Sequence, residues 1–326
     1  MAAASHHSGD MEIIVRVPAH AAEIHEAVGA AVKNASIPWH STTKPLVAAA
    51  MLYHVDQEPT LGLDDLVTDH IPGWTGTGVE ATATLRHALA FTSGIAAGQR
   101  PWVVASDQAD YQARVAALPD GVSNGRSGGQ RHTYDTDNED ISGEMVRGAI
   151  GATSFADLFA QWVNTTGYFP SMVLDGPIYS AARKGTGPAS EYADFLEDVL
   201  AGAVAGMSSA LYDEFTSDQT AGTDQALAGE AFDVASDIGE DWRMSFGWWL
   251  ECRHSRFVCS GGAPYPRMST FGLGGQYCSV DFAKGYIVVI GPTYPGVGES
   301  EADTIYWWRD HIEGLVELWI AQGCPS

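Results

Sequence analysis

Strand-like segments crowd the stretch from residue 246 to residue 290 and constrain the fold more than any other feature of this chain. Four of them follow one another: FGWWLEC (246–252), RFVCS (256–260), GQYCSVD (275–281) and GYIVVI (285–290). They are rich in β-branched and aromatic residues, and the last two are separated by turn residues at 283–285. Strands joined by so short a connection pair antiparallel. We therefore expect an antiparallel sheet built largely from this region.

Both ends of the chain add to this sheet. Glu12–Val17 (EIIVRV) alternates and is β-branched, which predicts a strand. Ala21–Lys33 carries apolar residues at helical spacing, and residues 305–320 repeat apolar residues on one helical face. The expected fold is α/β of the α+β type: an antiparallel sheet assembled from both chain ends and flanked by terminal helices.

The middle of the chain predicts helices rather than strands. Segments with helical spacing, such as Phe155–Val163 and Glu191–Ala205, alternate there with Gly- and Pro-rich loops. We expect residues 1–55 and 241–326 to form an α/β lobe that holds the sheet and residues 56–240 to form a mainly helical lobe. The active site should lie between the two lobes.

The charge of the chain excludes some partners. With 41 acidic and 17 basic residues the formal net charge is -24, which repels nucleic acids and anionic lipid surfaces. No apolar run approaches the length of a membrane span, and the N-terminal residues lack the pattern of a signal peptide. We expect a soluble, cytoplasmic protein with no nucleic-acid partner and no membrane insertion.

The four cysteines, Cys252, Cys259, Cys278 and Cys324, are too few and too scattered to form a disulfide framework. Free thiols are the favoured interpretation, and a bridge between Cys252 and Cys259 across a hairpin remains open.

The first candidate for chemistry is Ser41-Thr42-Thr43-Lys44, an S-x-x-K motif at the start of a predicted helix. Residues three apart on a helix share a face, so a neutral Lys44 amine could take the proton of the Ser41 hydroxyl. The backbone N–H groups and positive dipole at a helix N-terminus favour an oxyanion formed there. This placement suits acyl transfer.

Two further segments could complete such a site. Tyr134 lies in a polar loop that leads into a helical stretch, and its phenol could relay protons if Lys44 lowered its pKa. FGLGGQ (271–276) precedes a predicted strand, and its glycines would allow a substrate to approach backbone N–H groups closely. Taken alone, a single tyrosine is far more often a packing residue, and the glycine-rich segment is equally compatible with a simple hairpin entry.

Other motifs are weaker. Ser123 and Ser127 each occupy a G-x-S-x-G pattern, but a nucleophile elbow needs a strand before it and a helix after it, and this stretch is a polar loop. His20, Glu23 and His25 come near a zinc-binding pattern, but the two histidines are five apart and do not share a helical face. We expect neither a metal nor a cofactor.

In this order the three segments resemble a known family. PWHSTTKPLVAAAMLYHVDQEPTLGLDDLVTDHIPGW followed by ATLRHALAFTSGI is similar to the β-lactamase-related serine hydrolases. Downstream, YDTDNEDISGEMVRGAIGATSFADLF resembles the family's Tyr-x-Asn segment, and FGLGGQYCSVDFAKGYIVVI looks like its final strands. The ending G-x-x-G-Q is most like 6-aminohexanoate-dimer hydrolases and carboxylesterases. The resemblance covers about residues 37–290 and implies a β-lactamase/transpeptidase-like fold.

The resemblance also assigns roles. It implies that Ser41 is the nucleophile, Lys44 its activator and Tyr134 the residue that passes a proton to the leaving group. The oxyanion hole would consist of the backbone N–H groups of Ser41 and Leu273. Residues Thr136, Gly272, Gly274 and Gln276 would contact the substrate.

Two departures from the family pattern bear on the substrate. Thr136 stands where class C β-lactamases and D,D-peptidases carry Asn, and no Lys- or His-Thr-Gly triplet precedes the last strands, although Arg267-Met-Ser269 could be its remnant. Both groups orient the carboxylate of a β-lactam or peptide. We therefore expect a carboxylesterase or amidase acting on a small molecule, with weak β-lactamase activity at most. An acyltransferase and a non-catalytic, penicillin-binding-like sensor remain alternatives.

Overall fold

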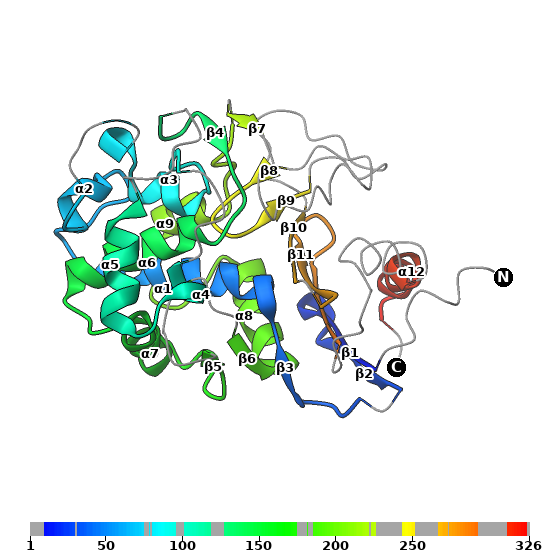
Figure 1. Ribbon diagram of the computed structural model, residues 1–326. Helices are drawn as coiled ribbons and strands as arrows, with labels where there is room; N and C mark the ends of the chain where they lie inside the picture. The colour runs from blue at the N-terminus through cyan, green and yellow to red at the C-terminus, as the bar shows by residue number, and fades with distance from the viewer. Residues whose placement is uncertain are drawn as a thin grey trace.

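The computed structural model describes residues 10–29, 31–74, 78, 80–95, 101–118, 127–174, 181, 185–221, 223–225, 243–251, 267–272, 274–292 and 312–324. Within these ranges, one antiparallel sheet has seven strands in the order β2-β1-β12-β11-β10-β9-β8 (Figure 1). They are β1 (Met11–Val17), β2 (Ala22–Val28), β8 (Arg243–Met244), β9 (Trp249–Leu250), β10 (Arg267–Gly272), β11 (Gln276–Asp281) and β12 (Tyr286–Pro292). The prediction of an antiparallel sheet assembled from both chain ends is confirmed.

Side chains alternate across each strand, so both faces of the sheet carry apolar residues. A helix packs on each face. Helix α8 (Ala189–Ala201) packs on the face that carries Ile14 and Val289. Helix α12 (Gly314–Ala321) covers the other face, where its Val316 joins a cluster with Val15 and Val288. In Figure 1 the sheet accordingly stands between α8 and α12. Central strands buried on both sides explain why β12 reads as an unbroken apolar run.

One predicted element is wrong. Residues 21–33 do not form a helix, because Ala22–Val28 is strand β2, which pairs antiparallel with β1 over its whole length. Parts of three other predicted elements lie outside the described residues. They are the whole of the predicted strand RFVCS (256–260), the last residue, Cys252, of the predicted strand 246–252, and residues 305–311 of the predicted C-terminal helix. Cys259 lies outside as well, whereas Cys278 is a buried free thiol and Cys324 a partly exposed one.

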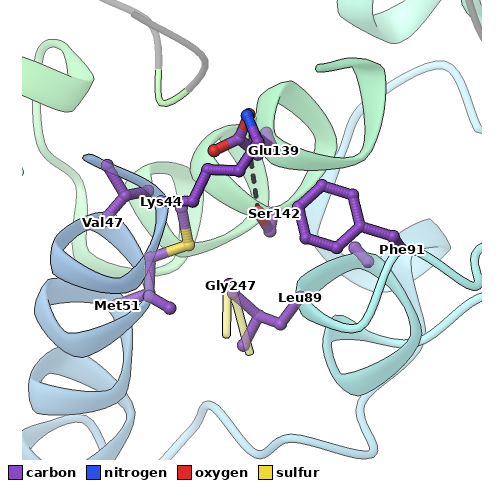
Figure 2. A pocket seen from close by; sticks show the side chains of 10 residues that line it. Lys44, Val47, Met51, Leu89, Phe91, Glu139, Ser142 and Gly247 are labelled. Atoms are coloured by element: carbon purple, nitrogen blue, oxygen red, sulfur yellow. Dashed lines mark hydrogen bonds and ion pairs between the residues drawn. The ribbon is translucent and has the colours of Figure 1, made fainter. Parts of the chain in front are cut away.

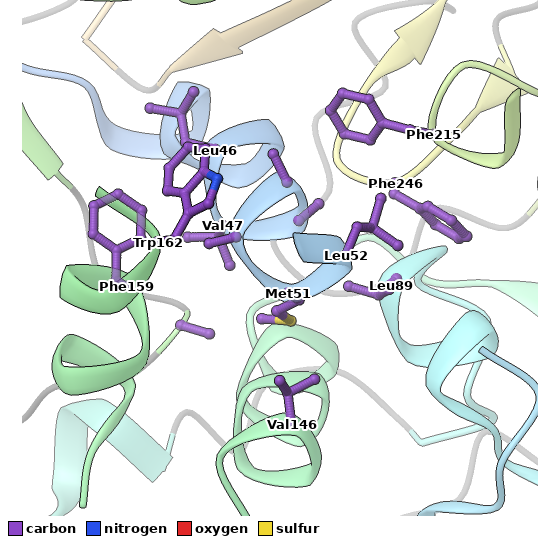
Figure 3. Close-up of a cluster of buried hydrophobic side chains, with 14 of the residues drawn as sticks. Leu46, Val47, Met51, Leu52, Leu89, Val146, Phe159, Trp162, Phe215 and Phe246 are labelled. Atoms are coloured by element: carbon purple, nitrogen blue, oxygen red, sulfur yellow. The ribbon is translucent and has the colours of Figure 1, made fainter. Parts of the chain in front are cut away.

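The remaining helices pack on α1, which is buried on nearly every side, and on its neighbour α6. Figure 3 shows Leu46, Val47, Met51 and Leu52 of α1 surrounded by apolar side chains of several neighbouring elements, among them Trp162 of α7. These helices are α1 (Lys44–Gln57), α2 (Val67–His70), α3 (Leu85–Leu89), α4 (Pro101–Val104), α5 (Gln108–Ala116), α6 (Asp137–Ile150), α7 (Phe155–Thr166) and α9 (Ser209–Phe215). A helix that is apolar all round belongs inside a core, so α1 is a rigid base for the residues at its N-terminus.

Short elements complete the described structure. The 3₁₀ helices are η2 (Pro18–His20), η3 (His40–Thr43) and η4 (Glu80–Thr82). A small antiparallel sheet joins β3 (Ser36–Pro38), β6 (Gly185–Pro188) and β5 (Val173–Leu174), and a parallel pair joins β4 (Arg131–His132) and β7 (Asp224–Gln225). Among the described residues, no helix has the length and apolar character needed to span a membrane.

Candidate active site

Ser41 lies in the 3₁₀ turn η3, which runs directly into α1. The backbone N–H of Lys44 donates to the carbonyl oxygen of Ser41, closing a turn in which side chains three residues apart eclipse one another. Ser41 is partly exposed, and within the described ranges neither its hydroxyl nor its amide is engaged in a hydrogen bond. The turn thus places a partly exposed serine three residues before Lys44.

The turn is held by strand β6 and helix α8. The carbonyl of Gly185 accepts from the Trp39 amide at 2.8 Å, and the Gly185 amide donates to Oγ1 of Thr43 at 2.9 Å. The hydroxyl of Tyr192 donates to the carbonyl of Thr42 at 2.7 Å. Residues on both sides of Ser41 are therefore fixed while Ser41 itself stays accessible.

Lys44 is buried and paired with a glutamate on α6. Its Nζ lies 2.6 Å from Oε2 of Glu139, and the two side chains are only 6% and 7% exposed. Figure 2 shows the pair at a small pocket lined also by Met51, Phe91 and Ser142. A buried charge pair of this kind is favourable only when both members are kept, because either one alone would be an uncompensated charge.

The pair determines the charge of Lys44. Burial alone would lower the pKa of Lys44, but the carboxylate of Glu139, together with Tyr134 and Asp135, raises this pKa above its ordinary value. Burial also raises the pKa of Glu139, and the Lys44 ammonium only partly offsets that effect. The resting form of Lys44 at neutral pH is therefore an ammonium, not the neutral amine considered from the sequence.

Tyr134 belongs to a group of aromatic rings that contact one another beside Lys44. Its ring centroid lies 5.3 Å from that of Phe91 and 5.3 Å from that of Trp249, and Trp249 in turn stacks on Phe271 at 5.6 Å. The Lys44 Nζ is 5.3 Å from the Tyr134 ring centroid, within the range of a cation–π contact. The structure therefore brings Lys44 and Tyr134 together, in surroundings that fix the tyrosine ring.

Two residues beside the site have left-handed backbone conformations. The φ angle of His40, directly before Ser41, is 47°, and that of Phe91 is 59°. Such conformations cost non-glycine residues about 1 kcal/mol or more and persist only where the surroundings impose them. At Phe91 the carbonyl oxygen accepts from the Thr133 amide at 2.7 Å, which ties this strained turn to the segment that carries Tyr134.

The glycine-rich turn after β10 meets the segment before Ser41. A Cβ atom added to Gly272 would lie 2.7 Å from the Trp39 carbonyl oxygen and 3.1 Å from the His40 Cβ, so only glycine permits this approach. Leu273, the expected second oxyanion donor, lies outside the described residues. Gly274 follows it, and its amide donates to Oε1 of Gln276 at 3.1 Å.

Gln276 and Thr136 were both expected to contact substrate. Gln276 is 1% exposed and its amide bridges the protein's own backbone, since Nε2 donates to the Pro38 carbonyl at 2.7 Å. This side chain is engaged in holding the turn rather than presented to a ligand. Thr136 is partly exposed at the N-terminus of α6, two residues after Tyr134, and its carbonyl accepts from the Asp140 amide at 3.1 Å.

The family model described as Beta-lactamase matches residues 20–309. The chain belongs to the Beta-lactamase family. No curated protein sequence matches this Beta-lactamase family member.

Solved structures agree on the fold. EstCE1, described as a hydrolase with promiscuous acyltransferase activity, is 14% identical with a TM-score of 0.69 and coverage of 92% of each chain. A β-lactamase from Mycobacterium bovis is 19% identical with a TM-score of 0.60, covering 92% of this chain and 94% of that one. A D-stereospecific amidohydrolase from Streptomyces sp. is 13% identical with a TM-score of 0.65, covering 94% and 95%. At these identities the likeness establishes the shared β-lactamase/transpeptidase-like fold.

Sequence analysis overlooked Glu139. The available signal was a glutamate five residues after Tyr134, in the first turn of a helix, in a chain with only four lysines. Arg267, considered as a remnant of the third family motif, lies at the opposite end of β10 from Gly272. It is buried there, with Nη2 3.0 Å from Oδ2 of Asp281 and hydrogen-bonded to Glu313, so it does not take part in the candidate site.

Proposed function

We propose that this chain is a serine hydrolase that forms an acyl-enzyme at Ser41 and hydrolyses an ester or amide bond of a small molecule. One observation carries the proposal: a partly exposed serine stands on a held 3₁₀ turn, three residues before a buried lysine that contacts a tyrosine ring. Nucleophile, proton-transfer groups and helix N-terminus then meet at one place, as acyl transfer requires.

The roles follow from the chemistry of each group. Ser41 Oγ attacks the substrate carbonyl, and Lys44 and Tyr134 move the serine proton to the leaving group. The backbone N–H groups of Ser41 and Leu273 hold the developing oxyanion. Water then attacks the acyl-enzyme and releases the acyl group, so the cycle needs no cofactor.

The surroundings of the site favour a neutral substrate. The aromatic rings of Tyr134, Trp249 and Phe271 form an apolar wall beside Lys44, and Lys44 itself is already paired with Glu139. Thr136 offers no charge to a substrate carboxylate. These features support a carboxylesterase or amidase rather than an efficient β-lactamase.

Acyl transfer to an alcohol or amine is the second candidate, because it shares the acyl-enzyme. It is favoured by the fold shared with EstCE1, whose description includes promiscuous acyltransferase activity. Product analysis with an added alcohol acceptor distinguishes the two, since transfer yields a new ester and hydrolysis only the acid.

The test is intact-protein mass spectrometry after exposure to a fluorophosphonate, with turnover of short p-nitrophenyl esters measured in parallel. We expect one adduct, mapped to Ser41, repeated turnover, and loss of both in Ser41→Ala. Ser127→Ala is the matched control, because Ser127 sits in the rejected G-x-S-x-G pattern and should behave as wild type. A protein that neither reacts nor turns over would indicate a binding protein, and silencing by Ser127→Ala would place the nucleophile elsewhere.

A further inference from the structure

The ion pair between Lys44 and Glu139 poses a chemical problem for the proposed reaction. A base for the Ser41 proton needs a free lone pair, and an ammonium has none. The pair is nevertheless buried and held in one short contact of 2.6 Å between Nζ and Oε2. Among the described residues, the group that accepts a hydrogen bond from Lys44 Nζ is the Glu139 carboxylate, so this carboxylate can receive the Lys44 proton.

We propose that Glu139 is the positioning residue that holds Lys44 as an ammonium in the free enzyme and takes its proton when Lys44 acts as base on Ser41. This proposal rests on the proposed function of Ser41 as nucleophile. It adds a third member to the proton path, which runs from Ser41 through Lys44 to Glu139.

The protons balance at each step. Lys44 Nζ passes one proton to Oε2 of Glu139, which leaves a neutral amine and a carboxylic acid. The amine takes the Ser41 Oγ proton as the bond from Oγ to the carbonyl carbon forms and the carbonyl electron pair moves to oxygen. When the bond to the leaving group breaks, Lys44 returns that proton to it through Tyr134. The remaining proton then moves from Glu139 back to Lys44.

The surroundings make transfer within this pair cheap. Burial disfavours the charged form of both groups, so the neutral amine and neutral acid lie closer in free energy to the ion pair than they would in water. The other titratable groups acting on Lys44 are Tyr134 and Asp135, both in the segment that leads into α6. α3 and the turn at Gly247 present only uncharged atoms to the pocket.

Helix α6 supplies a matched comparison residue. Glu144 is also a buried carboxylate on α6, 5% exposed, and burial raises its pKa in the same way. Its partner is Arg147, with Nε 2.8 Å from Oε2 of Glu144, rather than Lys44. Glu139→Gln and Glu144→Gln therefore remove equivalent charges from one helix, and only the first touches the proposed proton path.

The experiment measures the rate of Ser41 labelling by a fluorophosphonate as a function of pH. This reaction reports activation of the serine without knowledge of the substrate, because the Oγ–P bond forms as fluoride leaves. In the wild type we expect labelling to fall on the acid side, where solvent protonates the Glu139 carboxylate and it can no longer accept the Lys44 proton; burial places this step above the ordinary pKa of glutamate. In Glu139→Gln, Lys44 must lose its proton to solvent. The variant loses the strongest charge that raises the pKa of Lys44, while Tyr134 and Asp135 still raise it. Labelling should therefore follow deprotonation of Lys44, drop about 10-fold or more below pH 7 and recover at alkaline pH.

If Glu139 had only a structural role, Glu139→Gln would lower the labelling rate equally at all pH values. The proposal requires instead that the acid limb, the fall in labelling rate at low pH, moves to higher pH in this variant. Glu144→Gln should keep the wild-type limb, and Glu139→Asp, which retains the charge, should lie between wild type and Glu139→Gln. If Glu139→Gln kept the pH profile of the wild type while Ser41→Ala remained unreactive, the role of Glu139 would be overturned and the proposed function of Ser41 would stand. Labelling that persists in Ser41→Ala would overturn the proposed function and this inference with it.

A measurement on the wild-type protein covers the case in which the Glu139 variants fail to fold. The chain has four lysines, Lys33, Lys44, Lys184 and Lys284, so lysine labelled with ¹³C at Cε gives a simple spectrum. We expect the Lys44 signal to remain that of an ammonium at neutral pH and to shift on the acid side as Glu139 is protonated. A Lys44 signal of a neutral amine at pH 7 would overturn the proposal.

Discussion

The side-chain amide of Gln276 donates a hydrogen bond to the carbonyl oxygen of Pro38, with 2.7 Å between nitrogen and oxygen. The bond joins the start of β11 to the end of β3, three residues before Ser41. The same side chain accepts from the amide of Gly274 at 3.1 Å. One glutamine thus sets the distance between the nucleophile segment and the glycine-rich turn that should carry the second oxyanion donor.

Replacing Gln276 by methionine should therefore damage catalysis more than substrate binding. Gln276→Met keeps the length of the side chain but removes both hydrogen bonds, so the turn can drift from the serine. We expect kcat for a p-nitrophenyl ester to fall about 10- to 100-fold with a smaller change in KM, as for loss of an oxyanion donor. Gln219→Met is the control, because that amide contacts Glu214 on α9 instead. A kcat equal to that of wild type would show that the turn is held by other contacts.

Adding a single methyl group at Gly272 tests the close contact between the glycine-rich turn and the segment before Ser41 by a second change, made in the turn itself. The new Cβ would lie 2.4 Å from Oε1 of Gln276 and 2.7 Å from the Trp39 carbonyl, distances that force the backbone apart. We expect Gly272→Ala to lose at least about 10-fold in kcat and to unfold at lower denaturant concentration, since overpacking costs about 1–3 kcal/mol. Gly314→Ala on α12 is the control, because its Cβ would meet nothing within 4 Å. Equal activity and stability of the two variants would contradict the tight fit at Gly272.

The sequence predicted the hairpin of β11 and β12 well, for a physical reason. Both strands are buried on both faces, and a short turn that ends in Gly285 joins them. β12 is therefore almost entirely β-branched, aromatic or otherwise apolar, and β11 contributes Tyr277, Cys278 and Val280. The helix predicted for residues 21–33 was wrong because Ile24 and Val28 are four apart, and this spacing places them on one face of a helix and equally on one face of a strand. Pairing with β1, which local sequence does not encode, decides between the two.

The candidate site likewise contains residues that local sequence identifies and residues whose contacts depend on the fold. Ser41 and Lys44 are adjacent in sequence, so a local motif was enough to identify them. Glu139 is 95 residues from Lys44, and its ionic contact exists only because α6 packs against α1. The role of Gln276 likewise depends on β3, 238 residues earlier, whereas from sequence a glutamine beside a glycine-rich turn could as well have faced the substrate.

The aromatic contacts of Tyr134 predict a separation between catalysis and stability. Tyr134→Phe keeps the ring that contacts Phe91 and Trp249 and removes only the hydroxyl. We expect turnover to fall about 100-fold or more while the free energy of unfolding changes by less than about 1 kcal/mol. Trp249→Leu, which removes a stacking partner instead, should destabilise the fold by about 1–3 kcal/mol. Full turnover by Tyr134→Phe would remove Tyr134 from the proton path.

The burial of Asp135 predicts that the stability of the fold decreases as pH rises. The side chain is 4% exposed, Oδ1 accepts from the amide and Nδ2 of Asn138, and Oδ2 has no partner within the described ranges. Burial, with a contribution from Asp137, raises the pKa of Asp135 to about 7. The folded protein therefore binds a proton that the unfolded chain has already released from about pH 4 upward.

Stability from this group is complete below the unfolded pKa, falls as pH rises, and is fully lost above about pH 7. Between pH 5 and pH 8 the wild type should lose about 2–3 kcal/mol more than Asp135→Asn, whose side chain does not titrate. Urea unfolding of both proteins at the two pH values measures this difference. Asp157→Asn is the control, because hydrogen bonds from Thr153 lower the pKa of Asp157 and its removal should not reproduce the effect. Identical losses in the wild type and Asp135→Asn would mean that Asp135 is already ionised at pH 5 in the folded protein.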